Sequence, residues 1–141
     1  MLGTFLEIDA KPILSLAYEH QVSFDRAEAQ ILGIGHAEVG ASVLEHWNLP
    51  ARVVEVVRWH HEPETSPAPS PSLDLVHAAD SLATLSGIGA GVDGLNYRPS
   101  KEVMGRLHVT TRVSESVING MLTGLEELRN VFMLALGRKS Q

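Results

Sequence analysis

The sequence predicts an all-helical fold. Apolar residues recur at helical spacing along most of the chain, helix-capping residues stand between these runs, and no segment has a credible partner strand. The chain has 141 residues and a hydrophobic content of 44%, which is enough for one domain with a real core. We therefore expect a helical bundle of about six or seven helices in a single domain that spans residues 1–141.

The first third of the chain contains three helix patterns. An apolar stripe runs over residues 10–20, and a second helix is expected to follow Ser23 and to continue through Leu32. Gly33 and Gly35 should break that helix. A third helix is predicted from about His36 to Trp47.

The fourth pattern is ambiguous between a helix and a strand. The segment Asn48-Leu49-Pro50 ends the third helix and begins the next element, since proline suits the first turn of a helix. The valines that follow favour a strand by their β-branching, but their spacing also fits a helix. Because no other segment offers a partner strand, we predict a helix.

The second half of the chain alternates loops with helices. Four prolines make residues 63–72 a loop, and the glycine-rich residues 87–94 are expected to be flexible. A helix is predicted from Leu73 to Gly87. Ser100 should cap a short helix through Leu107, and Thr110 should cap a long one, with Gly137 past its end.

Composition excludes several classes of function. The net charge of −6 and the lack of a Lys/Arg cluster argue against nucleic acid and anionic membranes as partners. No apolar run approaches the roughly 20 residues that span a bilayer, and the first residues lack the basic region of a signal peptide. The absence of cysteine excludes disulfides and thiolate chemistry, in keeping with a cytoplasmic protein.

Histidine is the informative residue type, with seven copies. His60, His61 and Glu62 follow one another at the end of the fourth predicted helix. His77 and Asp80 stand three residues apart, so both face the same side of a helix, and His36 opens the third helix. Imidazole and carboxylate ligands from three helices suit zinc, iron, manganese or nickel. The remaining histidines, at positions 20, 46 and 108, are predicted to be structural.

Four motifs together resemble the HDOD domain, a relative of the HD phosphohydrolases and of the HD-GYP cyclic-di-GMP phosphodiesterases. They are the stretches Ile34-Gly35-His36-Ala37-Glu38-Val39-Gly40-Ala41, Trp47-Asn48-Leu49-Pro50, Trp59-His60-His61-Glu62 and Leu75-Val76-His77-Ala78-Ala79-Asp80. The resemblance covers roughly residues 23–83, and each motif alone would be unspecific.

The resemblance implies a set of site residues. Metal ligands of the active HD-GYP relatives correspond to His36, His60, His61 and Asp80, with His77 and Glu62 in the same pocket. They would hold a divalent iron, manganese, zinc or nickel ion. The chain departs from this pattern, because it contains no His-Asp dipeptide and no Gly-Tyr-Pro sequence after the histidine pair. Open-site hydrolysis is therefore not expected, and the metal site is interpreted as vestigial.

Taken with the missing ligands, the resemblance implies a non-catalytic HDOD-type output domain in bacterial signal transduction, a regulatory domain that binds protein partners. The alternative is a metal-dependent phosphohydrolase of the HD superfamily that acts on a nucleotide or a cyclic dinucleotide, with water as the nucleophile. A third possibility is a structural metal site without turnover, which would also use His77.

The first residues suggest a truncated domain. Gly3-Thr4-Phe5-Leu6 resembles the segment that follows the His-Asp doublet position in HDOD proteins. We therefore expect the chain to be the C-terminal part of such a domain, without its N-terminal helices. Apolar surface left uncovered by those helices would favour a homodimer.

Overall fold

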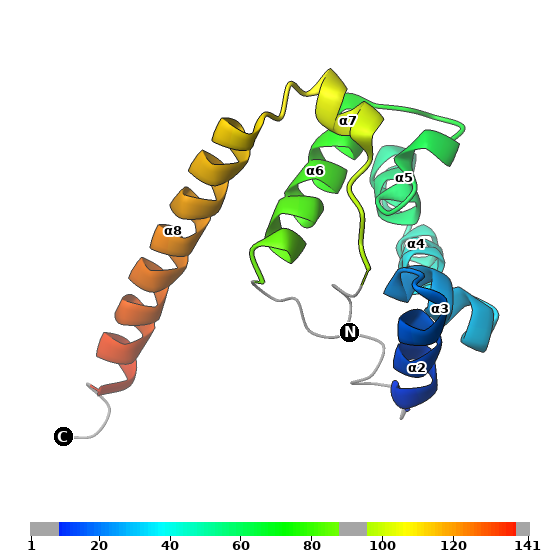
Figure 1. Cartoon of the computed structure of the whole chain (residues 1–141), viewed down its shortest axis with the longest axis horizontal. Coiled ribbons are helices and arrows are strands. Elements are labelled where there is room, and N and C mark those ends of the chain that lie inside the picture. Colours follow the sequence, from blue (N-terminus) through cyan, green and yellow to red (C-terminus); the bar gives the residue numbers. More distant parts are fainter. Residues whose placement is uncertain (1–8, 88–95, 138–141) are drawn as a thin grey trace. The chain divides into compact units, whose positions relative to one another are not determined.

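The structure, a computed structural model, describes residues 9–87 and 96–137, and their side chains as far as Leu134. These residues form seven α-helices and one short 3₁₀ turn, and none of them forms a strand, which confirms the all-helical prediction (Figure 1). The helices are α2 (Lys11–His20), α3 (Phe24–Leu32), α4 (His36–His46), α5 (Ala51–Trp59), α6 (Pro71–Leu85), α7 (Lys101–Arg106) and α8 (Thr111–Gly137). No helix in these described ranges is long and apolar enough to cross a membrane.

The chain divides into two compact units, residues 1–108 and residues 109–141. The first contains α2 to α7, and the second contains α8. The prediction of a single domain over residues 1–141 stays a prediction.

The hydrophobic core of the first unit begins between α2 and α3. Ile13, Ala17, Phe24 and Ala27 are buried against one another. The side-chain amide of Asn96 donates to the backbone carbonyl oxygens of Ala17, at 3.0 Å, and of Val22, at 3.3 Å. This contact ties the segment that begins at Asn96 to the turn between the two helices.

The ambiguous valine segment is helical and lies against α4. His36 of α4 contacts His61 just beyond α5, and Gly40 of α4 lies opposite Val57 of α5, so the two helices run antiparallel. A Cβ on Gly40 would stand only 3.1 Å from a methyl group of Val57. Glycine at this position therefore allows the close approach that brings the start of α4 to the end of α5.

The proline-rich segment is shorter as a loop than the predicted range of residues 63–72. Pro63–Thr65 forms a 3₁₀ turn, and α6 begins at Pro71 instead of Leu73. The Ser70 hydroxyl accepts a hydrogen bond from the Leu73 amide at 3.2 Å, which makes Ser70 the N-cap. Proline fits the first helical position because its missing N–H would have no partner there. Of the predicted flexible residues 87–94, all but Gly87 lie outside the described residues.

The predicted caps of the last helices are confirmed. The Ser100 hydroxyl accepts from the Val103 amide at 3.1 Å, and the Thr110 hydroxyl accepts from the Val113 amide at 3.3 Å. Ser23 also stands at the N-cap of α3, although its hydroxyl makes no capping hydrogen bond.

Two leucines of α6 provide a test of the core. Leu73 is fully buried, whereas Leu75 is 59% exposed on the same helix. Leu73→Ala should lower the free energy of unfolding by roughly 2–5 kcal/mol, because it removes transfer free energy and leaves a cavity. Leu75→Ala should change it by less than about 1 kcal/mol. Urea unfolding of both variants measures the difference, and equal losses would contradict this placement of the core.

Candidate metal centre

Three histidines meet where α4 begins and α5 ends. His36 is the first residue of α4, and His60 and His61 follow α5 directly. One ring nitrogen from each lies within 4.8 Å of the other two. The Nε2 atoms of His36 and His61 are 2.8 Å apart. The antiparallel packing of α4 against α5 is what brings residues 25 positions apart in sequence into this contact.

The ring of His36 is oriented by a buried carboxylate. Glu28 of α3 is only 5% exposed, and its Oε2 accepts a hydrogen bond from His36 Nδ1 at 2.7 Å. The same oxygen accepts from the His36 backbone amide, at the positive N-terminal end of α4. With its Nδ1 proton donated to Glu28, His36 directs the lone pair of its Nε2 toward the cluster.

His60 is oriented by the backbone of its own helix. Its Nδ1 donates to the carbonyl oxygen of Val57 at 2.7 Å. Since a carbonyl can only accept, His60 carries its proton on Nδ1 and keeps a lone pair on Nε2. Burial lowers the pKa of His60 below its usual range, so the ring is neutral near pH 7.

His61 is the most strongly perturbed member of the cluster. Its buried Nδ1 has no hydrogen-bond partner among the described residues, and Asp80 Oδ2 is 3.7 Å away, beyond hydrogen-bond distance. Burial, followed by the nearby charge of His60, lowers the pKa of His61 to about 3. The ring is therefore neutral at pH 7, the protonation state in which imidazole binds a metal.

The structure brings only three of the four predicted ligands together. His36, His60 and His61 come together, whereas Asp80 is not part of that group. Asp80 instead faces the Nδ1 side of His61, the position from which carboxylates commonly orient metal-bound histidines.

The two predicted pocket residues have different surroundings. His77 of α6 is buried, and its Nδ1 donates to the carbonyl oxygen of His60 at 2.6 Å while its Nε2 accepts from the Ser100 amide at 2.9 Å. Both ring nitrogens of His77 are therefore used in holding the backbone. Glu62 is more exposed, and its Oε1 pairs with Arg26 Nη2 at 2.9 Å. Both residues line a cavity of about 220 Å³.

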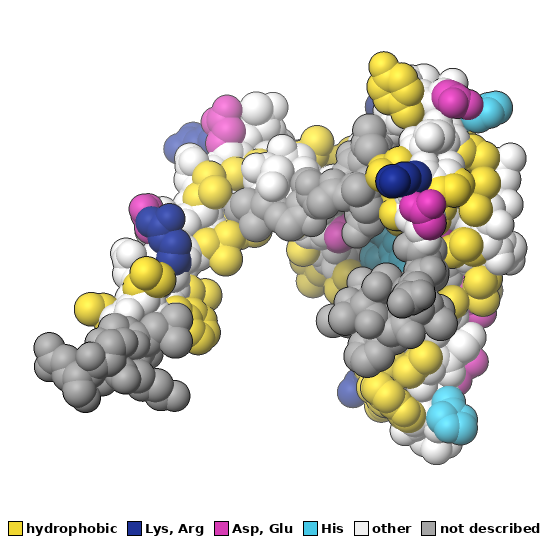
Figure 2. Space-filling model, turned by 90° about the horizontal axis from the view of Figure 1, so that it is seen from below, with side chains coloured by type: hydrophobic (Ala, Val, Ile, Leu, Met, Phe, Trp, Pro, Cys, Tyr) yellow, Lys and Arg dark blue, Asp and Glu magenta, His cyan; other side chains and the backbone are white. Residues whose placement is uncertain are grey.

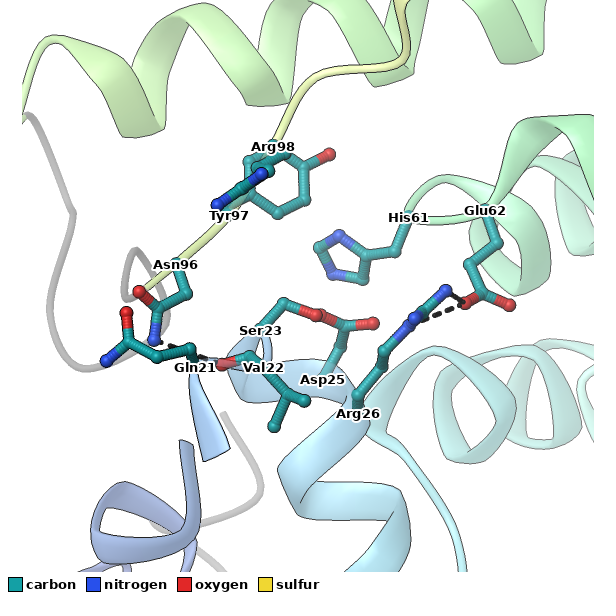
Figure 3. A pocket seen from close by; sticks show the side chains of 10 residues that line it. All are labelled: Gln21, Val22, Ser23, Asp25, Arg26, His61, Glu62, Asn96, Tyr97 and Arg98. Atoms are coloured by element: carbon teal, nitrogen blue, oxygen red, sulfur yellow. Dashed lines mark hydrogen bonds and ion pairs between the residues drawn. The ribbon is translucent and has the colours of Figure 1, made fainter. Parts of the chain in front are cut away.

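A second cavity of about 250 Å³ adjoins the first and has His61 in its wall (Figure 3). Several of its lining residues were not singled out from the sequence. These are Gln21, Val22, Asp25, Arg26, Asn96, Tyr97 and Arg98. Burial raises the pKa of the Tyr97 phenol, so its hydroxyl stays protonated. No spacing in the sequence relates residues 21–26 to residues 96–98, which meet only because Asn96 is bound to the turn after α2.

The donor set fits a single divalent metal ion. Three imidazole rings gathered at one point suit zinc, iron, manganese or nickel. Two nitrogens bound to one ion at about 2.1 Å each lie at most about 4.2 Å apart. Binding would therefore draw the more distant nitrogens together and would separate the 2.8 Å pair of His36 and His61 to admit the ion. The Nδ1 of His61 has no hydrogen-bond partner among the described residues. If His61 bound an ion through Nε2, this Nδ1 would carry the ring proton on the side that Asp80 faces.

Comparisons with known proteins agree with the sequence resemblance. Residues 1–63 match the family model of the HDOD domain, a range that includes all three clustered histidines. A 28-residue stretch is 50% identical to an uncharacterized protein of Treponema pallidum (strain Nichols). That match covers 20% of this chain and 6% of the other protein, so the chain spans a small part of that relative. No solved structure gives a significant match.

The depressed pKa of His61 predicts a pH-dependent stability. In the unfolded chain the His61 ring becomes protonated below about pH 6.5, whereas in the folded chain it becomes protonated only near pH 3. The free energy of unfolding should therefore fall as pH falls, by roughly 2 kcal/mol from this residue between pH 6.5 and pH 5.

Urea unfolding of chelator-treated protein across this range measures the effect. His61→Gln should flatten the profile, whereas His46→Gln, which changes an exposed histidine of α4, should leave it unchanged. Parallel profiles for wild type and His61→Gln would contradict the assignment.

Proposed function

Since this chain contains a partial HDOD domain, we propose that it is a non-catalytic regulatory domain that acts through protein partners in bacterial signal transduction. Its histidine cluster, in this proposal, is a binding site for one metal ion. The cluster contributes to the stability and shape of the domain instead of turning over a substrate.

One observation carries the non-catalytic part of the proposal. Among the described residues, the ligand-capable group consists of three imidazoles and includes no carboxylate. The neighbouring carboxylates, Glu28 and Asp80, face the Nδ1 sides of His36 and His61. Two-metal phosphoester hydrolysis depends on ligands that hold both ions about 3.5–4 Å apart. The sequence has no His-Asp doublet to add such a ligand.

The chain's own residues would prepare the cluster for a single ion. Glu28 and the Val57 carbonyl fix two of the rings with their Nε2 lone pairs available. His77 holds the backbone at His60 in place. A bound divalent ion would supply Lewis acidity and would cross-link the start of α4 to the end of α5.

A metal-dependent phosphohydrolase remains the second candidate, and the cavity beside His61 is the observation that favours it. Arg26 and Arg98 both line that cavity, and guanidinium groups bind phosphate oxygens well. Arg26, however, is already paired with Glu62.

An activity assay separates the two functions. Purified protein with added Mn²⁺ or Fe²⁺ should hydrolyse bis(p-nitrophenyl) phosphate and cyclic-di-GMP no faster than the His36→Ala variant does. The physical reason is that the cluster lacks a carboxylate that could bridge two ions. Hydrolysis that is lost in His36→Ala and kept in His46→Ala would overturn the proposal.

Metal binding by the cluster is a separate prediction. Zn²⁺ or Mn²⁺ at about 100 times its dissociation constant should add roughly 2.7 kcal/mol to the free energy of unfolding. His36→Ala and His61→Ala should abolish this gain, whereas His46→Ala should keep it. Thermal unfolding with and without metal, together with metal analysis of dialysed protein, provides the measurement. An equal gain in all variants would show that the ion binds elsewhere.

A further inference from the structure

Helix α8 presents an apolar surface that nothing in its own unit covers. It is the one described element of residues 109–141, and Figure 2 shows hydrophobic side chains along it. The large apolar side chains exposed on α8 are Val113, Val117, Leu122, Leu125, Leu128, Val131, Phe132, Met133 and Leu134. Helices in proteins gain most of their stability from packing an apolar face. A helix of 27 residues with this surface therefore needs a partner.

Part of this surface has the spacing of a coiled coil. Apolar residues separated alternately by three and four positions form a seam along one side of a helix. On α8 these residues are Ile118, Met121, Leu125, Leu128 and Phe132. Ser114 occupies the next seam position toward the start of the helix, whereas Val113 and Met133 lie outside the seam.

We propose that two copies of this chain dimerise through α8, with the two helices antiparallel along this seam. The inference goes beyond the proposed function, because it assigns a surface and a partner that the metal centre does not involve.

The antiparallel register follows from matching side chains along the seam. With the two-fold axis at Thr123, Met121 packs against Leu125 of the partner subunit, and Ile118 packs against Leu128 of the partner subunit. Ser114 then lies opposite Phe132 of the partner subunit, where a small side chain leaves room for the ring. A parallel dimer would instead place the two phenylalanines against each other and the two serines against each other.

Charge complementarity also selects the antiparallel register. In it, Glu115 flanks Arg129 of the partner subunit, and the two-fold axis repeats this pair at the other end. In a parallel dimer Arg129 would flank Gly124 of the partner subunit, so neither charge would meet an opposite one. Within its own chain, Arg129 makes only a 3.4 Å contact with exposed Glu126.

The flanks of the seam fit the same register. Val117 lies beside Val131 of the partner subunit, and Leu122 lies beside its own symmetry mate. Gly124 also meets its symmetry mate near the axis. A Cβ on Gly124 would meet no atom within 4 Å in the single chain. Glycine inside a helix costs about 1 kcal/mol relative to alanine, and close approach of a second helix would give it a structural use.

The oligomeric state of the full chain is the first test. Light scattering and sedimentation should give twice the 15.3 kDa mass of one chain, with dissociation on dilution. Leu125→Glu should raise the dimer dissociation constant more than roughly 100-fold, because it buries unpaired carboxylates at the centre of the interface. Met133→Glu changes an equally apolar but non-seam position and should leave the dimer intact. Far-UV circular dichroism of each variant confirms that the helices are retained.

Charge reversal tests the pairing of Glu115 with Arg129. Glu115→Arg and Arg129→Glu alone should each weaken the dimer by roughly tenfold at low salt, and the double variant should restore it. Both positions are exposed in the single chain, so these substitutions should not unfold it.

Cross-linking tests the direction of the helices, and the absence of native cysteine makes single-cysteine variants unambiguous. Leu122→Cys should form a disulfide-linked dimer under mild oxidation, whereas Leu128→Cys should not. The reverse result would overturn the antiparallel register. A monomeric wild type at millimolar concentration, or a dimer that survives Leu125→Glu, would overturn the proposal itself.

Discussion

The contact between the Glu28 carboxylate and His36 is the interaction on which the rest of the site depends. One oxygen of Glu28 accepts from both the ring Nδ1 and the backbone amide of His36. It therefore fixes the first turn of α4 and the ring that projects from it at the same time. A buried carboxylate would be costly without such partners, and the positive end of a helix is where it is best compensated. Because α5 packs antiparallel to α4, this fixed end of α4 also determines where His60 and His61 arrive.

His77 supports the cluster through the backbone next to it. It is buried and neutral in this arrangement, with one nitrogen on the His60 carbonyl and the other on the Ser100 amide. This single side chain connects α6 to the end of α5 and to the start of α7. In the sequence His77 resembles a metal ligand, yet both of its ring nitrogens form hydrogen bonds to backbone groups, which gives it a structural role. Removing it would leave the half-buried Ser100 amide and His60 carbonyl without these partners, a penalty of at most roughly 1–3 kcal/mol for each group.

Much of the fold follows from local sequence signals, whereas the site follows only in part. Ser100 and Thr110 cap the predicted helices because a side-chain oxygen at that position satisfies a free amide whatever the tertiary context. The start of α6 differs from the prediction because the proline content of residues 63–72 indicates a loop, whereas Pro71 also suits the first helical turn. His36, His60 and His61 were predicted together through the family motifs. Glu28 was not, since a lone glutamate on an amphipathic helix has no sequence mark of burial.

The energetics of the cluster favour a binding role over simple packing. Apolar side chains of similar size would fill the same volume without the cost of desolvating imidazoles. Here three rings are gathered, and one of them keeps a buried Nδ1 without a partner in the described part of the chain. His36 and His61 approach to 2.8 Å through their Nε2 atoms. Because His36 donates its Nδ1 proton to Glu28, its Nε2 accepts, and a neutral His61 donates its single proton from Nε2. An ion bound at the cluster would replace that proton, which would then sit on His61 Nδ1, the side of the ring that Asp80 faces at 3.7 Å.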